Sequence, residues 1–134
     1  GATTTWEHWN GNRSRIHNCY NGIGSWFYQA VGGIRSDDSE AFRSLIIDPQ
    51  IPKEITWANI SKETPFGTIS VNWRKEQNLF TMEVTVPVGS KAKVLIPDSV
   101  KSFKMNGREI PNDLFVSETG SGKYFYEWQE ILPE

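Results

Sequence analysis

The sequence predicts a mainly β protein: an antiparallel, jelly-roll-like β-sandwich of about eight strands, preceded by a loop and one amphipathic helix. From residue 45 onward, apolar residues alternate with polar ones, which is the period of half-buried strands. Turn-forming residues interrupt this alternation at short intervals, and one stretch before it has helical spacing. The 134 residues are enough for one main hydrophobic core.

The first 19 residues show neither a helical nor a strand period. They are polar, aromatic and interrupted by glycine, which is typical of a functional loop. The chain does not open with a charged segment followed by an apolar one, as a signal peptide does, so we expect its start to be internal.

One helix is predicted over about residues 20–32. Asn18 or Asn21 can cap its start, and the pair Gly32-Gly33 provides a left-handed stop. Residues 36–39 are expected to form a linker, so we divide the chain into residues 1–36 and residues 45–134. The helix owes its prediction to an apolar stripe at helical spacing, namely Ile23, Trp26, Phe27, Ala30, Val31 and Ile34.

The second part alternates in short runs separated by turns. The best hairpin signal is Asn106-Gly107, because both residues adopt the left-handed conformations that a tight turn requires. Strands are expected at residues 45–47, 54–60, 69–73, 80–86, 92–96, 103–105, 114–118 and 124–128.

Charge and composition exclude several classes of partner. The chain has 14 Lys and Arg against 16 Asp and Glu, a net charge of -2, and no basic run, so we expect no nucleic acid and no anionic membrane as partner. No window approaches the roughly 18 apolar residues that span a bilayer. The single cysteine, Cys19, excludes an intramolecular disulfide but indicates no compartment.

The loop contains a candidate catalytic carboxylate. Glu7 lies between Trp6 and Trp9 and beside His8. Flanking indoles can desolvate a carboxylate and raise its pKa toward the range of a general acid or base, which is hydrolase-like chemistry. The alternative is an ordinary glutamate of a surface loop.

The same loop does not have the pattern of a metal or cofactor site. Glu7, His8, His17 and Cys19 lack the spacing of structural zinc ligands, and no His-Glu-x-x-His motif is present. The sequence Gly22-Ile23-Gly24 lacks the third glycine of a dinucleotide fingerprint. We therefore expect no metal and no cofactor.

The six tryptophans allow two interpretations. They can pack inside an aromatic-rich sandwich, or some can form a surface on which sugar rings stack. The candidates for such a platform are Trp57, Trp73 and Trp128.

Three segments occur in a recognisable order: GATTTWEHWNG, then HNCYNGIGSWFYQAVGGI, then TPFGTISVNWRKEQNLFTMEVTVPVGSKAKVLIP. On these segments, nearly the whole chain resembles the C-terminal end of bacterial α-L-rhamnosidases of glycoside hydrolase family seventy-eight. The resemblance implies that the first part is the last active-site loop and the last helix of an (α/α)₆ barrel. It also implies that a small antiparallel sandwich follows the barrel.

The resemblance also implies a mechanism. Gly1 through Glu7 match an active-site stretch whose glutamate is the general base of an inverting hydrolysis. His17 matches a histidine that contacts rhamnose, and we expect Trp6 and Trp9, which flank the base, to contact substrate as well. The family's general acid lies far upstream, so the chain alone is expected to be inactive.

The expected partners are therefore L-rhamnose-containing glycosides. The side chains of Trp26, Phe27, Val31 and Ile34 would pack against other barrel helices, so in this chain we expect the helix to dock on the sandwich or to form a homodimer. Two other functions stay open at this stage: a non-catalytic carbohydrate-binding sandwich, and a structural domain that binds a protein partner.

Overall fold

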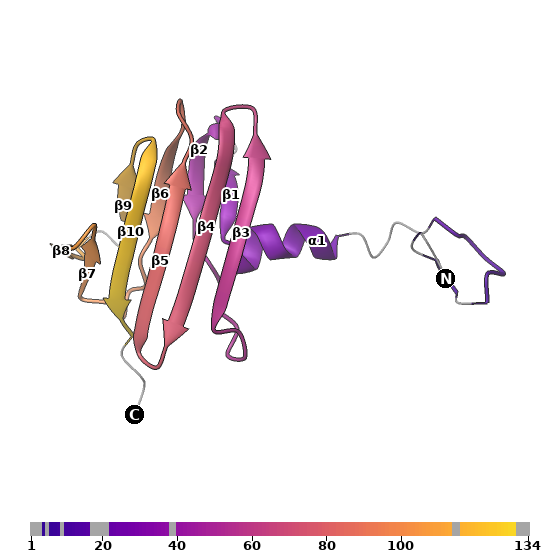
Figure 1. Ribbon diagram of the computed structural model, residues 1–134, viewed down its shortest axis with the longest axis horizontal. Helices are drawn as coiled ribbons and strands as arrows, with labels where there is room; N and C mark the ends of the chain where they lie inside the picture. Colours follow the sequence, from indigo (N-terminus) through magenta and orange to yellow (C-terminus); the bar gives the residue numbers. More distant parts are fainter. Residues whose placement is uncertain are drawn as a thin grey trace.

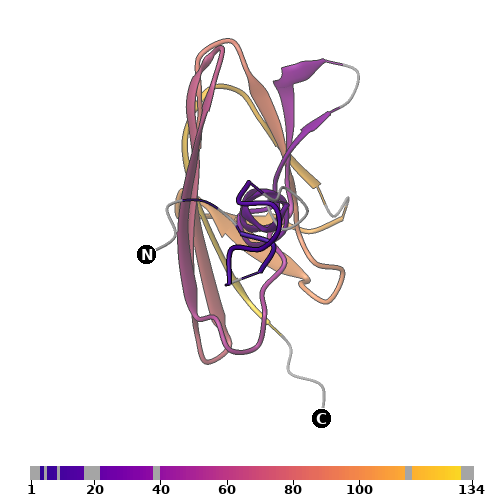
Figure 2. The same ribbon diagram turned by 90° about the vertical axis from the view of Figure 1, so that its right-hand side faces the viewer.

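Two β-sheets face each other, and a short helical segment enters at one edge between them (Figure 1). The computed structural model describes residues 4, 6–8, 10–16, 22–37, 40–113 and 116–130. Seen from the helix side, the helix lies end-on between the two layers (Figure 2). The predicted mainly β sandwich is thus confirmed.

The larger sheet is antiparallel throughout and forms the near layer in Figure 1. Its strand order is β3-β4-β5-β10-β7-β8, with β3 and β8 at the edges. The strands are β3 (Trp57–Thr64), β4 (Gly67–Glu76), β5 (Leu79–Val86), β10 (Gly122–Gln129), β7 (Ser102–Met105) and β8 (Arg108–Pro111).

The smaller sheet has the order β1-β2-β6-β9. It consists of β1 (Ile34–Asp37), β2 (Ala41–Ile47), β6 (Lys91–Leu95) and β9 (Val116–Thr119). Strands β2 and β6 pair in parallel, with Leu45 opposite Ala92. Between them the chain forms three strands of the larger sheet, β3, β4 and β5, before it returns to the smaller one. Within the described residues this parallel pair is the one exception to the predicted antiparallel pairing.

The described residues form ten strands, two more than the eight predicted. The prediction missed β1 because residues 34–36 were assigned to the helix end and the linker, whereas Ile34 pairs with Ile47. It missed β8 because residues 108–111 do not alternate. The predicted Asn106-Gly107 hairpin is confirmed: it joins β7 to β8 with φ angles of 51° and 80°.

The described helix is shorter than predicted. An α-helical turn, α1 (Ile23–Trp26), continues into a π-helical turn, η2 (Phe27–Val31), and helical structure ends there. The predicted caps Asn18 and Asn21 lie outside the described residues. No helix among the described residues is long and apolar enough to cross a membrane.

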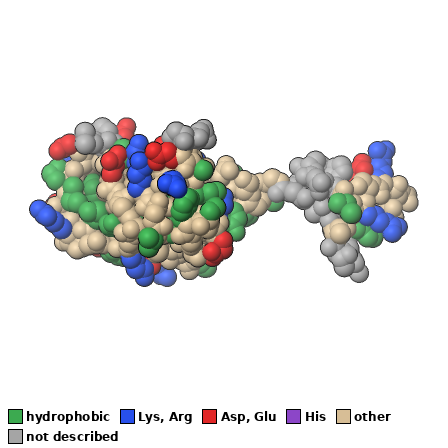
Figure 3. Space-filling model, turned by 90° about the horizontal axis from the view of Figure 1, so that it is seen from above, with side chains coloured by type: hydrophobic (Ala, Val, Ile, Leu, Met, Phe, Trp, Pro, Cys, Tyr) green, Lys and Arg blue, Asp and Glu red, His purple; other side chains and the backbone are tan. Residues whose placement is uncertain are grey.

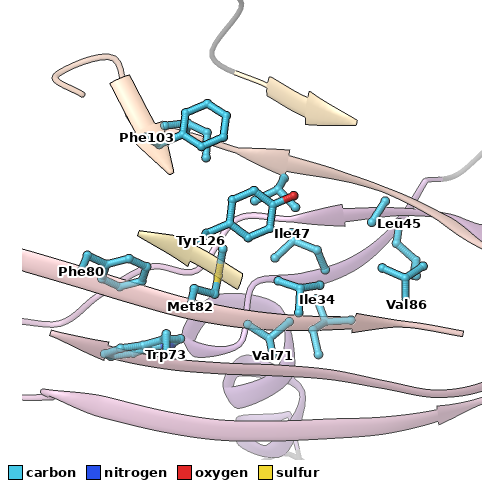
Figure 4. Close-up of a cluster of buried hydrophobic side chains, with 14 of the residues drawn as sticks. Ile34, Leu45, Ile47, Val71, Trp73, Phe80, Met82, Val86, Phe103 and Tyr126 are labelled. Carbon is cyan, nitrogen blue, oxygen red and sulfur yellow. The ribbon is translucent and has the colours of Figure 1, made fainter. Parts of the chain in front are cut away.

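Side chains from the inner faces of both sheets form one hydrophobic core (Figure 4). Along β5, Phe80, Met82, Val84 and Val86 are all buried, as the alternation predicted. At one end of the core an aromatic stack forms, in which Phe80 lies 4.5 Å from Trp128 and 5.9 Å from Trp73 between ring centroids.

Burial decides between the two interpretations for three of the tryptophans. Trp73 and Trp128 are 2% and 4% exposed, so they are core residues and do not form a surface platform. Only Trp57 among the three proposed platform residues is exposed, at 58%. Of the three candidates for a sugar-stacking platform on the sandwich, Trp57 is therefore the one that remains.

Candidate functional site

The described residues near the N-terminus (4, 6–8 and 10–16) belong to a loop that closes on itself. The Glu7 amide donates a hydrogen bond to the Ser14 carbonyl at 2.9 Å, and the Gly11 amide donates to the His8 carbonyl at 3.0 Å. The second bond closes a tight turn at the tip of the loop. Glu7 therefore lies opposite Ser14, directly before the turn.

Two neighbours hold the Glu7 carboxylate. Its Oε1 lies 3.4 Å from Arg13 Nη1, and its Oε2 accepts a hydrogen bond from the Ser14 amide at 3.4 Å. The Glu7 side chain is 27% exposed, whereas that of Arg13 is 66% exposed. An ion pair this exposed contributes little to stability.

Trp6 is held on the same loop. Its indole N–H donates to the Thr4 hydroxyl at 3.1 Å, and the Arg15 guanidinium lies over the ring at 5.4 Å from its centroid. The Thr4 hydroxyl in turn donates to the Arg15 carbonyl. These contacts fix the indole next to the residue that carries the candidate base.

The structure brings together part of the predicted site. Trp6 and Glu7 are partly buried neighbours, and His8 is exposed. Trp9, His17 and Cys19 lie outside the described residues, so the expected substrate contacts of Trp9 and His17 stay predictions, as does the catalytic role of Glu7. Among the described residues, no group of three or more His, Cys, Asp and Glu side chains could hold a metal ion.

Sequence reasoning did not associate Arg13 with Glu7. The two lie six positions apart, so in a helix they would point to different faces and in a strand they would lie about 20 Å apart. The turn closed by the hydrogen bond from the Gly11 amide to the His8 carbonyl brings them together. Its sequence signal is the pair Asn10-Gly11, in which Gly11 has a φ of 71°.

The loop lies beyond the helix, away from the sandwich (Figure 3). Together, α1 and η2 expose four large apolar side chains: Ile23 at 68%, Trp26 and Phe27 at 47% and Tyr28 at 40%. The rings of Trp26 and Phe27 meet edge to face at 5.2 Å. The helical segment thus presents an apolar surface to solvent.

The C-terminal end of the predicted apolar stripe docks on the sandwich, which is one of the two outcomes expected for it. Val31 and Ile34 are 3% and 2% exposed, because both belong to the sandwich core. The helix stops at residue 31, and Ile34 points inward from strand β1 and is not on a helical face. Only Trp26 and Phe27 of the four predicted contact residues are available for a partner.

The end of the helix is tied to the sandwich by three hydrogen bonds, one of which is buried. The Trp73 indole N–H donates to the Val31 carbonyl at 2.8 Å inside the core. The Gln50 amide donates to the Ala30 carbonyl at 2.8 Å, and the Asp48 amide donates to the Gly33 carbonyl at 3.0 Å. We call these three hydrogen bonds the junction, since they join the end of the helical segment to β4 and to the residues that follow β2.

Family models match the chain in two consecutive segments. Residues 1–31 match the bacterial alpha-L-rhamnosidase 6 hairpin glycosidase domain. Residues 33–110 match the bacterial alpha-L-rhamnosidase C-terminal domain. The two matches meet at the junction.

Similar curated proteins are much longer than this chain. An alpha-L-rhamnosidase from Alteromonas sp. (strain LOR) is 35% identical over 108 residues, which are 72% of this chain and 12% of that protein. One from Formosa agariphila is 31% identical over 125 residues, which are 84% of this chain and 13% of that protein. The chain thus spans about an eighth of the length of these relatives.

Solved structures show the same fold. The Streptomyces avermitilis alpha-L-rhamnosidase complexed with L-rhamnose matches with a TM-score of 0.74 and 26% identity, covering 94% of this chain and 14% of that one. The alpha-L-rhamnosidase from Dictyoglumus thermophilum matches with a TM-score of 0.78 and 24% identity, covering 96% of this chain and 16% of that one.

Proposed function

The chain belongs to the bacterial α-L-rhamnosidase family, in which it corresponds to the C-terminal domain and the end of the glycosidase domain, and we propose that the whole protein hydrolyses terminal α-L-rhamnosides with inversion. The observation that carries this proposal is the consecutive match of the two family models, with the candidate base inside the first. The division of the chain into a glycosidase part, residues 1–36, and a sandwich domain, residues 45–134, stays a prediction.

In the proposed mechanism, Glu7 is the general base. Its carboxylate takes a proton from water, and the water oxygen attacks the anomeric carbon of rhamnose while the glycosidic bond breaks. The contacts with Arg13 and with the Ser14 amide support this role, because they limit the orientations of the carboxylate. A base held in place loses less entropy when it engages water.

The same step also needs an acid. A carboxylic acid about 6.5–9.5 Å from the base protonates the leaving oxygen in an inverting enzyme, which leaves room for the water. The family resemblance locates this acid upstream of the residues present here. We therefore propose that the 134-residue chain alone is inactive.

The apolar surface of the helical segment has a place in this proposal. Ile23, Trp26, Phe27 and Tyr28 would pack against neighbouring helices of the glycosidase domain, whose family model ends within this segment at residue 31. Such packing would set the position of the Glu7 loop in the whole enzyme. A second copy of the chain is the alternative cover, and size-exclusion chromatography of wild type beside Trp26→Ser distinguishes the two.

The test compares the 134-residue chain with the same chain extended upstream through the glycosidase domain, on an aryl α-L-rhamnoside. We expect hydrolysis only from the extended protein, with β-L-rhamnose as the first product in proton NMR spectra. Release of α-L-rhamnose would contradict inversion. Turnover by the short chain would show that the general acid lies within it.

A further inference from the structure

The outer face of the larger sheet carries two exposed aromatic side chains. Trp57 on β3 is 58% exposed, and Phe125 on β10 is 43% exposed. Strands β4 and β5 lie between β3 and β10, so about 14 Å separates β3 from β10. This face is turned toward the viewer in Figure 1, and it is distinct from the Glu7 loop.

Polar side chains form the floor between the two aromatic residues. In one row, Asn59 pairs with Asn72, Asn72 with Glu83, and Glu83 with Phe125. In the next row Trp57 pairs with Arg74. Together with Thr81 these residues line a shallow hollow of about 170 Å³, open to solvent.

The floor offers unused hydrogen-bonding capacity. Within the part of the chain that the structure describes, no hydrogen bond reaches the side-chain amide of Asn59 or of Asn72. Each amide presents two donors and an acceptor. At the rim, Arg74 pairs with Glu76 at 3.3 Å and Glu83 pairs with Lys123 at 3.0 Å, so the charges there are balanced.

We propose that this aromatic-rimmed face, made by Trp57, Asn59, Asn72, Glu83 and Phe125, binds a neutral oligosaccharide. An aromatic ring covers the apolar C–H face of a sugar, while paired amide donors and acceptors match its hydroxyl groups. The balanced charges disfavour a strongly anionic polymer. Two separated aromatic side chains over a polar floor also differ from a protein interface, which has a contiguous apolar centre.

This binding face does not depend on the proposed hydrolysis. Substrate would reach Glu7 through the glycosidase domain, whereas the aromatic-rimmed face would hold a remote part of a carbohydrate chain. Its role would be to keep the protein on a polymeric substrate, which raises the effective concentration of cleavable ends.

The test is a titration of the ¹⁵N-labelled 134-residue chain with an α-linked L-rhamnose oligosaccharide and, separately, with cellohexaose. We expect saturable shifts of the Trp57 indole N–H and of the Asn59 and Asn72 side-chain amides with one of these probes. Trp57→Ala and Asn72→Ala should each weaken binding roughly tenfold, the loss of one stacking or hydrogen-bonding contact. Tyr28→Ala, which removes an exposed aromatic ring on the helix, should leave binding unchanged.

Several results would overturn the proposal. The proposal fails if neither oligosaccharide shifts these resonances. It also fails if the resonances shift with protein concentration in the absence of sugar, because such shifts indicate self-association. Shifts confined to Trp6 and His8 would place the sugar on the loop, supporting the proposed hydrolase site while refuting this face. Because both substituted side chains on this face are at the surface, an unchanged far-ultraviolet spectrum verifies the fold of each variant.

Discussion

A methyl group added at Gly33 should destabilise the protein far more than the same change at another glycine. Gly33 has a φ of 65°, and a Cβ placed there would lie 2.2 Å from the Pro49 nitrogen and 2.3 Å from the Asp48 carbonyl carbon. Both neighbours are backbone atoms, so no side-chain rotation can relieve the overlap. Gly33→Ala therefore tests the junction between the helix and the sandwich.

The cost has two parts. The left-handed backbone conformation costs a residue with a Cβ about 1–2 kcal/mol. Non-bonded carbon contacts are favourable at about 3.5–4.0 Å, so the chain on one side must move by more than 1 Å. That movement disrupts the hydrogen bond from Asp48 to Gly33 and the one from Gln50 to Ala30, at about 1 kcal/mol each.

The expected loss is thus about 3–4 kcal/mol in the free energy of unfolding. The assay is urea unfolding followed by circular dichroism, with linear extrapolation to water. Gly107→Ala is the matched control, because Gly107 also has a positive φ, 80°, but nothing lies within 4 Å of the added Cβ. It should lose only about 1–2 kcal/mol. Equal losses for the two variants would refute the close approach at Gly33 and with it the packing of the junction.

Three further predictions concern the core and its junction with the helix. Trp73→Phe keeps an aromatic ring but removes the donor to the buried Val31 carbonyl. It should lower the free energy of unfolding in urea by about 1–3 kcal/mol and expose the helical segment to limited proteolysis. Unchanged cleavage of that segment would count against an anchoring role for Trp73. Val84→Ala, at a fully buried position, should cost about 2 kcal/mol while the whole enzyme keeps its preference among rhamnosides, and altered specificity would contradict a non-catalytic sandwich. Burial raises the pKa of Tyr126 above its ordinary value of 10.0, so the folded state holds this proton more tightly than the unfolded state does. The stability that this raised pKa contributes is complete below pH 10 and is lost as the pH rises through the folded-state pKa of Tyr126. Tyr126→Phe should therefore reduce the loss of unfolding free energy at alkaline pH, measured by urea unfolding at a series of pH values. An unchanged dependence on pH would contradict the role of Tyr126 in that loss.

The sequence predicts the sandwich well because its signals are local and periodic. The alternation of Phe80, Met82, Val84 and Val86 survives as an inward-facing row, and Asn106-Gly107 forms the hairpin expected of it. Both features depend on neighbouring residues alone. Which strands pair, and in particular the parallel pairing of β2 with β6, depends on contacts between distant segments, which no local period encodes.

The helix boundary shows how tertiary contacts override a local pattern. Ile34 continues the helical spacing of Val31, and the spacing therefore predicts one continuous face. Yet the left-handed turn at Gly33 redirects the chain, and Ile34 is buried in strand β1 at 2% exposure. A glycine pair predicts that a helix stops, but it does not predict where the next residue packs.

Tryptophan environments were equally ambiguous in the sequence. Trp57, Trp73 and Trp128 all occur in alternating segments, and only their position in the register separates core from surface. Trp73 and Trp128 share the inner face with Phe80, whereas Trp57 lies on the outer face opposite Arg74. In the candidate catalytic loop no period exists at all, so the contact of Glu7 with Arg13 could not be predicted.

The measurement that tests the central claim most directly is the turnover of an aryl α-L-rhamnoside by the upstream-extended enzyme, wild type beside Glu7→Gln. Glu76→Gln is the matched control, because Glu76 also pairs with an exposed arginine, Arg74, at 3.3 Å. We predict that Glu7→Gln lowers kcat by about 10²–10⁴, the usual contribution of a general base, and that Glu76→Gln has no effect. Undiminished turnover by Glu7→Gln would contradict the assignment of Glu7 as the catalytic base.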